Sequence, residues 1–165
     1  MRKRGNMLTA ERLREVLHYC PETGEFTIKV SRGSRTAPVG AKTGTINKNG
    51  YVVIGIDSKV YYAHRLAWLY MTGEWPSSRE IDHRDLDRSN NKWINLRQAS
   101  SSQNKGNKKV RMDSRSGIKG VMISRNGKGW VVRAARRHIG TFYSIEDSRA
   151  AYDNEARNFF GEFTR

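Results

Sequence analysis

Residues 80–104, EIDHRDLDRSNNKWINLRQASSSQN, form the stretch around which the rest of the chain can be interpreted. They place Asp82 directly before His83 and follow this pair with several asparagines. A carboxylate beside an imidazole can hold a hard cation and activate a water molecule next to it. Asparagine oxygens can complete such a site or fix the tautomer of the imidazole. The stretch therefore predicts a reaction centre, and a surface turn is the alternative.

The spacing of the polar residues favours the reaction centre. Residues 80–83 are interpreted as a strand, 96–99 as a returning strand and 100–107 as a short helix that a serine caps. Twelve positions separate His83 from Asn95 and nine separate Asn95 from Asn104, enough for each change of direction. Four side chains can then meet at one site: Asp82, His83, Asn95 and Asn104. Asp85 and Asp87 are expected to face solvent, with a role as extra metal ligands as the alternative. Asn90 and Asn91 are expected to hold the backbone of the loop.

The residues before this stretch predict a mixture of helices and strands. A helix is expected over Thr9–Tyr19 with Thr9 as its cap, and a strand over Glu25–Val30. Residues 31–49 are rich in Gly, Pro and Asn and predict a loop with short strands. Residues 51–56 and 60–63 predict a hairpin, and 64–71 a helix. For His64, at the start of that helix, a phosphate contact and a structural hydrogen bond both remain open.

The residues after it predict a second, smaller fold. Strands are expected over 119–125, 130–135 and 136–142, with a turn at 126–129. Ser144 and Asp147 resemble a capping box, and the apolar positions that follow fit one face of a helix to about Phe160. Three strands and one covering helix make a complete α+β fold. On the second strand, Val132 and Ala134 are expected to face the helix and Arg133 to face outward.

Composition points to a nucleic acid or an anionic membrane surface as the partner. The 165 residues include 31 Lys and Arg against 16 acids, a formal charge of +15. Residues 105–140 hold eleven of the basic residues and one acid, a net +10, which favours a phosphate-binding face there. We find no apolar run long enough to span a membrane and no signal-peptide core, so a cytoplasmic protein is expected. The lone Cys20 excludes an internal disulfide and a multi-cysteine zinc site.

DHRDLDRSNNKWINLRQASSSQN resembles the ββα-metal finger of HNH endonucleases, especially phage and intron homing enzymes. The segment AHRLAWLYMTGEWP, residues 63–76, is similar to the one that leads into that finger in phage members. The resemblance implies that Asp82 and Asn104 bind one Mg²⁺ or Mn²⁺ ion and that His83 is the general base. It implies that Asn95 orients His83 through the other ring nitrogen. Asn104 stands where many members have a histidine.

Residues 117–163 resemble the plant ethylene-response-factor type of DNA-binding domain. The matching motifs are Gly120-Val121, Gly127-Lys128-Gly129-Trp130, Ile139-Gly140-Thr141-Phe142 and Ala150-Ala151-Tyr152-Asp153. Met122 and Ala135 stand where that family usually has arginines, so its target sequence is not carried over. A basic sheet that does not read bases is the alternative. The resemblance and the basic stretch together give these candidate DNA contacts: Lys119, Arg125, Lys128, Arg133, Arg136, His138 and Thr141.

The sequence thus predicts a site-directed DNA endonuclease of fold class α+β. A nuclease domain is expected over residues 1–107, a basic linker over 108–116 and a DNA-binding domain over 117–165. Double-stranded DNA is the expected partner, in the cytoplasm of a bacterial or phage-infected host cell, with no membrane and no protein partner implied. A non-catalytic DNA-binding regulator and an RNA-binding protein are the alternatives.

Overall fold

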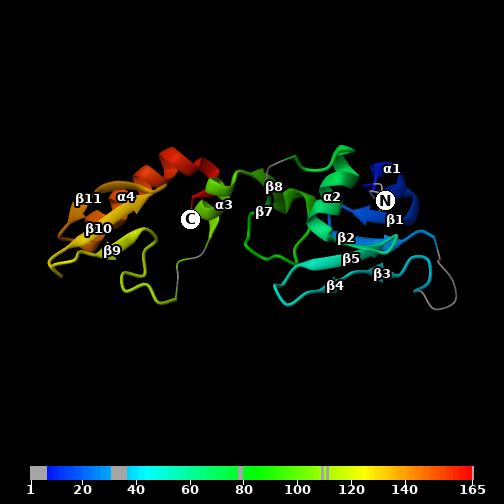
Figure 1. Cartoon of the computed structure of the whole chain (residues 1–165), viewed down its shortest axis with the longest axis horizontal. Helices are drawn as coiled ribbons and strands as arrows, with labels where there is room; N and C mark the ends of the chain where they lie inside the picture. The colour runs from blue at the N-terminus through cyan, green and yellow to red at the C-terminus, as the bar shows by residue number, and fades with distance from the viewer. Residues whose placement is uncertain (1–6, 31–36, 78–79, 109, 111, 165) are drawn as a thin grey trace, which may run out of the picture. The chain divides into compact units, whose positions relative to one another are not determined.

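The computed structural model describes residues 7–30, 37–77, 80–108, 110 and 112–164. The chain forms two compact units, residues 1–98 and residues 99–165, here called the first and the second unit (Figure 1). The division falls after Gln98 and not after Asn107, where the sequence placed the end of the nuclease domain. Among the described residues, no helix combines the length and the apolar character that a membrane span requires.

The first unit begins with helix α1 (Ala10–Val16), whose cap is Thr9 as predicted. The expected helix to Tyr19 is wrong in its last turn, because the chain extends after Val16 into strand β1 (Leu17–Cys20). Alternate residues of β1 are buried, and Tyr19 lies against Phe26 of the partner strand β2 (Glu25–Ile28) with ring centroids 4.8 Å apart. Burial of these aromatic rings in a hairpin explains why residues 17–20 form a strand and do not extend α1.

Two small sheets and a helix complete the core of this unit. Strands β1, β2 and β3 (Lys42–Thr43) form one sheet, and β4 (Thr45–Ile46), β5 (Val52–Ile56) and β6 (Lys59–Tyr62) form the other. Asp57 and Ser58 both have positive φ, as a two-residue hairpin turn of this hand requires, and the predicted hairpin is confirmed. Helix α2 (Ala63–Thr72) packs against α1, β5 and β6 (Figure 1). Its buried residues Leu66 and Leu69 join a core with Leu13, Ile54 and Ile56.

The last elements of the first unit frame the predicted reaction centre. Strand β7 (Glu80–His83) pairs with β8 (Leu96–Ala99), and the 3-10 helix η1 (Trp93–Asn95) leads into β8. The strand–loop–strand order agrees with the prediction for residues 80–99. Helix α3 (Ser101–Asn107) follows, and Ser100 caps it in a full capping box with Gln103.

Helix α3 packs within the second unit. Its Gly106 lies so close to Phe160 that an added Cβ would be 2.8 Å from the ring, so only glycine fits there without a shift. Strands β9 (Val121–Ile123), β10 (Trp130–Ala134) and β11 (Arg137–Phe142) form an antiparallel sheet in the order β11-β10-β9. Helix α4 (Ile145–Phe160) covers one face of this sheet (Figure 1), and the 3-10 helix η2 (Gly161–Phe163) follows it.

The predicted faces of the second sheet are confirmed, with one correction. Val132 and Ala134 are buried under α4, and Arg133 is exposed on the other face. Arg136 was expected on the third strand, but it lies with Ala135 in the turn between β10 and β11, and both residues have positive φ. A tight antiparallel return needs two such residues, which shortens both strands.

Candidate active site

The loop between β7 and β8 is held by its own carboxylates. Asp85 accepts hydrogen bonds from the side-chain amides of Asn90 at 2.6 Å and Asn95 at 2.9 Å, and from the Asp87 backbone N–H at 2.9 Å. Burial opposes the charged form of Asp85, but the hydrogen bonds from Asn90 and Asn95 outweigh it and lower the pKa of this carboxyl. Asp87 in turn accepts from the Ser89 backbone and hydroxyl. These carboxylates thus hold the loop together, whereas the sequence favoured solvent-facing carboxylates.

His83 is a buried imidazole at the end of β7, with 4% of its surface exposed. Its Nε2 lies 3.4 Å from the side-chain oxygen of Asn91. Burial lowers the pKa of His83 below its usual 6.5, against the opposing effects of Asn91 and the nearby aspartates. A neutral imidazole at physiological pH is the state that a general base requires.

Asn91 is fixed on three sides. Its side-chain amide donates to the Ser89 carbonyl at 2.9 Å, and its backbone carbonyl accepts from the Tyr19 hydroxyl at 2.7 Å. Its backbone also lies so close to Gly24 that an added Cβ there would be 2.4 Å away. The sequence assigned the orientation of His83 to Asn95 and gave Asn91 to the loop backbone. In the structure the Asn95 oxygen accepts from the Asp85 backbone N–H, and the Asn91 oxygen faces His83.

Asp82 carries an ion pair that the sequence did not reveal. Both Nε and Nη2 of Arg97 lie 3.1 Å from the Asp82 Oδ2 atom, and the two side chains are 7% and 5% exposed. Arg97 stands on β8, so the pair crosses the two strands of this ribbon. A carboxylate offers about four lone-pair positions on two oxygens. Asp82 therefore has the chemistry to bind a hard cation while it is paired with Arg97.

The two predicted cation ligands, Asp82 and Asn104, both offer oxygen atoms, and they belong to different units. Asn104 lies on α3 in the second unit, so its approach to Asp82 stays a prediction. Throughout the described residues, no cluster of three or more His, Cys, Asp and Glu side chains is placed to hold a metal ion. A set made of one carboxylate, one amide oxygen and water is typical of Mg²⁺ and differs from a zinc cluster.

His64 brings a second imidazole to His83. The two rings meet edge to face with centroids 5.1 Å apart, and Tyr62 stacks on the His64 ring at 5.5 Å. His64 is 7% exposed, and its Nδ1 has no hydrogen-bond partner among the described residues. Burial, followed by the nearby His83 and Arg65, lowers the pKa of His64 to about 3. His64 is therefore neutral, which argues against its role as a charged phosphate contact.

One family model matches part of this region. Residues 61–105 match the family model of the HNH endonucleases. This segment, 45 of the 165 residues, is thus similar to HNH endonucleases. It contains His64, Asp82, His83, Asn91 and Arg97, and it runs from β6 into α3.

One solved structure is similar to part of the chain. It comes from work on DNA binding and cleavage by the HNH homing endonuclease I-HmuI, with 24% identity and a TM-score of 0.42. The similarity covers 54% of this chain and 49% of that one, so this chain matches about half the length of its structural neighbour. Comparison with curated proteins finds no match.

The candidate DNA contacts outside the HNH segment lie in the second unit. On the sheet face away from α4, Val131 pairs with Met122 and Thr141, and Arg133 pairs with His138. Arg125, Lys128 and Thr141 line a pocket of about 260 Å³ together with Tyr143. The candidates that are exposed to solvent are Arg125, Lys128, Arg133, Arg136, His138 and Thr141.

Lys119 is placed differently from the other candidates. Its ammonium donates to the backbone carbonyls of Gly106 and of Lys108, the latter at 2.6 Å. These carbonyls lie at the end of α3, where a cation satisfies groups that the helix leaves unpaired. The contact ties the start of the sheet to α3, a role that sequence reasoning missed.

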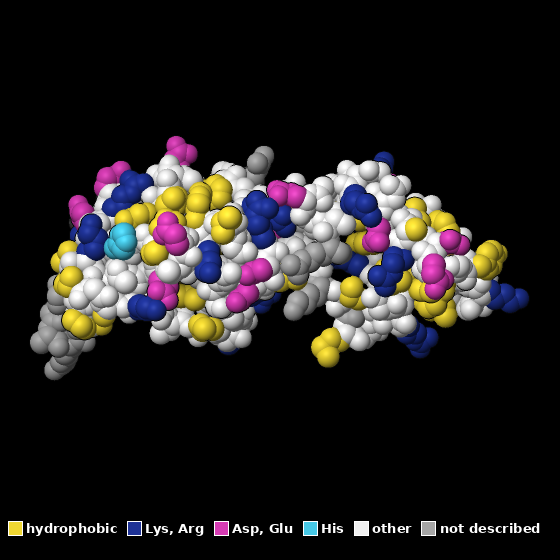
Figure 2. Space-filling model, turned by 180° about the vertical axis from the view of Figure 1, so that it is seen from behind, with side chains coloured by type: hydrophobic (Ala, Val, Ile, Leu, Met, Phe, Trp, Pro, Cys, Tyr) yellow, Lys and Arg dark blue, Asp and Glu magenta, His cyan; other side chains and the backbone are white. Residues whose placement is uncertain are grey.

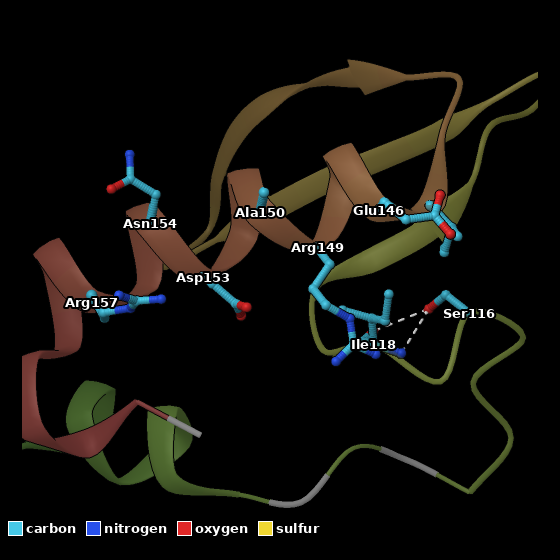
Figure 3. Close-up of a pocket in the computed structure, with 9 residues that line it drawn as sticks. Ser116, Ile118, Glu146, Arg149, Ala150, Asp153, Asn154 and Arg157 are labelled. Carbon is cyan, nitrogen blue, oxygen red and sulfur yellow. Dashed lines mark hydrogen bonds between the residues drawn. The ribbon is translucent and has the colours of Figure 1, made fainter.

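Charge is mixed on other surfaces. A pocket of about 540 Å³ between α4 and the loop at Ser116 and Ile118 is lined by Arg149 and Arg157 but also by Glu146 and Asp153 (Figure 3). The face drawn in Figure 2 likewise intersperses Lys and Arg with Asp and Glu. These surfaces lack the single sign of charge that a phosphate-binding face requires.

Proposed function

We propose that this protein is a metal-dependent DNA endonuclease in which His83 is the general base. The observation that carries the proposal is the buried, neutral His83 beside the buried carboxylate of Asp82, inside a segment that matches the HNH endonucleases. Phosphodiester hydrolysis needs a base for water and positive charge for the phosphate. His83 is the residue proposed to act as this base.

The contact between His83 and Asn91 supports one role for each ring nitrogen. An amide oxygen only accepts, so in the proposed state His83 carries its proton on Nε2, which faces the Asn91 oxygen. The Nδ1 lone pair is then the atom that takes the proton from the attacking water. The packing of His64 and Tyr51 against His83 holds the ring at this angle.

Asp82 and Asn104 would hold one divalent cation, Mg²⁺ or Mn²⁺. When bound, such an ion supplies charge that stabilises the phosphate and the leaving oxygen. Arg97 orients the Asp82 carboxylate, because two of its nitrogens contact the same carboxylate oxygen.

The second unit is proposed to bind double-stranded DNA. The exposed Arg133 and His138 on one sheet face support this assignment, as does the resemblance of residues 117–163 to the ethylene-response-factor domain. Arginine on a strand can reach guanine edges or phosphates. Lys119 is the weakest candidate, since its ammonium is bound to backbone carbonyls.

Incubation with supercoiled plasmid tests the proposal. Nicked or linear DNA is expected with Mg²⁺ or Mn²⁺, and intact plasmid with EDTA. Cleavage in excess chelator would contradict the metal assignment. Tight, salt-sensitive DNA binding without cleavage in either ion would favour the non-catalytic regulator, and preferential competition by RNA would favour the RNA-binding alternative.

A further inference from the structure

Arg88 is an exposed arginine that is nevertheless fixed in place. It lies in the loop between β7 and β8, and its guanidinium carbon stands 4.9 Å from the centroid of the Tyr51 ring. Its Nη1 donates to the Asn49 carbonyl at 2.9 Å. Both contacts come from a chain segment more than 30 positions earlier. Fixing an arginine costs side-chain entropy, so such order on a surface needs a reason.

Tyr51 connects Arg88 to the reaction centre. Its ring centroid is 6.1 Å from that of His83 and 5.3 Å from that of His64. The guanidinium therefore packs on a ring that itself contacts the proposed general base. A stacked guanidinium keeps its N–H groups in its own plane, directed away from the aromatic face. Of the five N–H donors, the Asn49 carbonyl takes one.

The charge of Arg88 is not neutralised within its own loop. Asp85 and Asp87 are the nearest acids in sequence. Asp85 accepts hydrogen bonds from Asn90 and Asn95, and Asp87 accepts from Ser89. In the part of the chain that the structure describes, no carboxylate forms an ion pair with Arg88. A side chain that only held the Asn49 carbonyl in place would need no charge, since a neutral hydrogen-bond donor would be enough. A positioned guanidinium with unused donors suits an anion.

We propose that Arg88 binds a phosphate of the DNA strand that is cut, beside His83. The inference rests on the proposed function, because it places the substrate's phosphate at the same site. The ligand chemistry is a phosphodiester oxygen pair, which the planar fork of arginine matches. Tyr51 is the platform that orients this fork. Arg88 would thus help to place the phosphate for attack by the water that His83 activates.

The first test compares cleavage of a duplex that carries the mapped plasmid cut site. Single-turnover rates at saturating enzyme are measured for wild type, Arg88→Ala and the control Lys92→Ala, which removes an exposed cation from the same loop. Loss of a charged hydrogen bond predicts a rate about 10- to 100-fold lower for Arg88→Ala, and a change under about twofold for the control.

The second test asks whether Arg88 acts through one phosphate. Phosphates around the cut are replaced one at a time by neutral methylphosphonates. One replacement should slow wild type as much as Arg88→Ala does, and should add no further loss in Arg88→Ala. Equal additional losses at every position would make Arg88 a brace of the loop and overturn the proposal.

The outcomes separate this inference from the proposed function. If wild type cuts DNA and Arg88→Ala matches Lys92→Ala, the Arg88 proposal alone is wrong. If wild type does not cut DNA with any divalent ion, the proposed function is wrong and the Arg88 proposal falls with it.

Discussion

Replacing Arg97 by methionine should destabilise the first unit strongly. The variant removes the guanidinium from Asp82 while methionine fills much of the space of the arginine stem. The pair is 7% and 5% exposed, so the remaining carboxylate would stay buried without its partner. Breaking one side of a buried ion pair costs about 3–5 kcal/mol. That loss is a large part of the roughly 5–15 kcal/mol that stabilises a typical domain.

The matched control is Arg12→Met. Arg12 pairs with Asp57 at the same distance, 3.1 Å, but the two side chains are 46% and 48% exposed. An exposed pair contributes little, because solvent and salt screen the two charges. The same chemical change therefore separates the effect of burial from the effect of the ion pair itself.

Urea unfolding of the full chain measures the difference. Trp68, Trp75 and Trp93 belong to the first unit and report on its unfolding by fluorescence. With a slope of about 2 kcal/mol per molar urea, Arg97→Met should lower the midpoint by about 2 M and Arg12→Met should lower it far less. Equal midpoints for the two variants would refute the reasoning. Mg²⁺ should raise the melting temperature of Arg97→Met more than that of wild type, because a cation on Asp82 replaces the lost charge.

Two predictions concern the histidines. The single-turnover cleavage rate should rise with pH and level off at or below about pH 6.5, because burial lowers the pKa of His83 and the base acts when neutral. A rate that falls as pH rises toward 6.5 would contradict the role of His83 as general base. Burial lowers the pKa of His64 to about 3 in the folded protein. As pH falls from 6.5 toward 3, the unfolded chain therefore binds a proton at this residue before the folded protein does. The free energy of unfolding should fall by at most about 5 kcal/mol over this range. His64→Phe should remove this part of the pH dependence of the unfolding free energy, and an unchanged dependence would count against it.

Local patterns in the sequence were sufficient for much of the fold. The cap at Ser144 and the apolar periodicity after it predict α4, and a turn over residues 57–59 predicts the β5–β6 hairpin, although Lys59 already belongs to β6. The β1 strand was missed because its residues Leu17 and Tyr19 continue the apolar spacing of α1. Only the packing of Tyr19 on Phe26 decides between the two structures.

The details of the candidate site depend on tertiary structure. The sequence selects Asp82 and His83 by type, but it cannot rank Asn91 and Asn95, which stand on the same loop and have the same chemistry. The Arg97 ion pair requires the pairing of β7 with β8, and the contact of His64 with His83 brings together residues 19 positions apart. Likewise, a lysine in a basic stretch is expected to bind phosphate, and only the fold brings Lys119 to the carbonyls at the end of α3.

Single-turnover DNA cleavage by His83→Ala tests the central claim most directly. The control is His18→Ala, which makes the same change at an exposed position on β1. With Mg²⁺ present, His83→Ala should cut about 10²–10⁴-fold more slowly than wild type, and His18→Ala should cut at the wild-type rate. Both variants should bind the DNA with wild-type affinity in a gel shift, because the cation ligands and the second unit are untouched. If His83→Ala cuts at close to the wild-type rate, His83 is structural and the proposed mechanism is wrong.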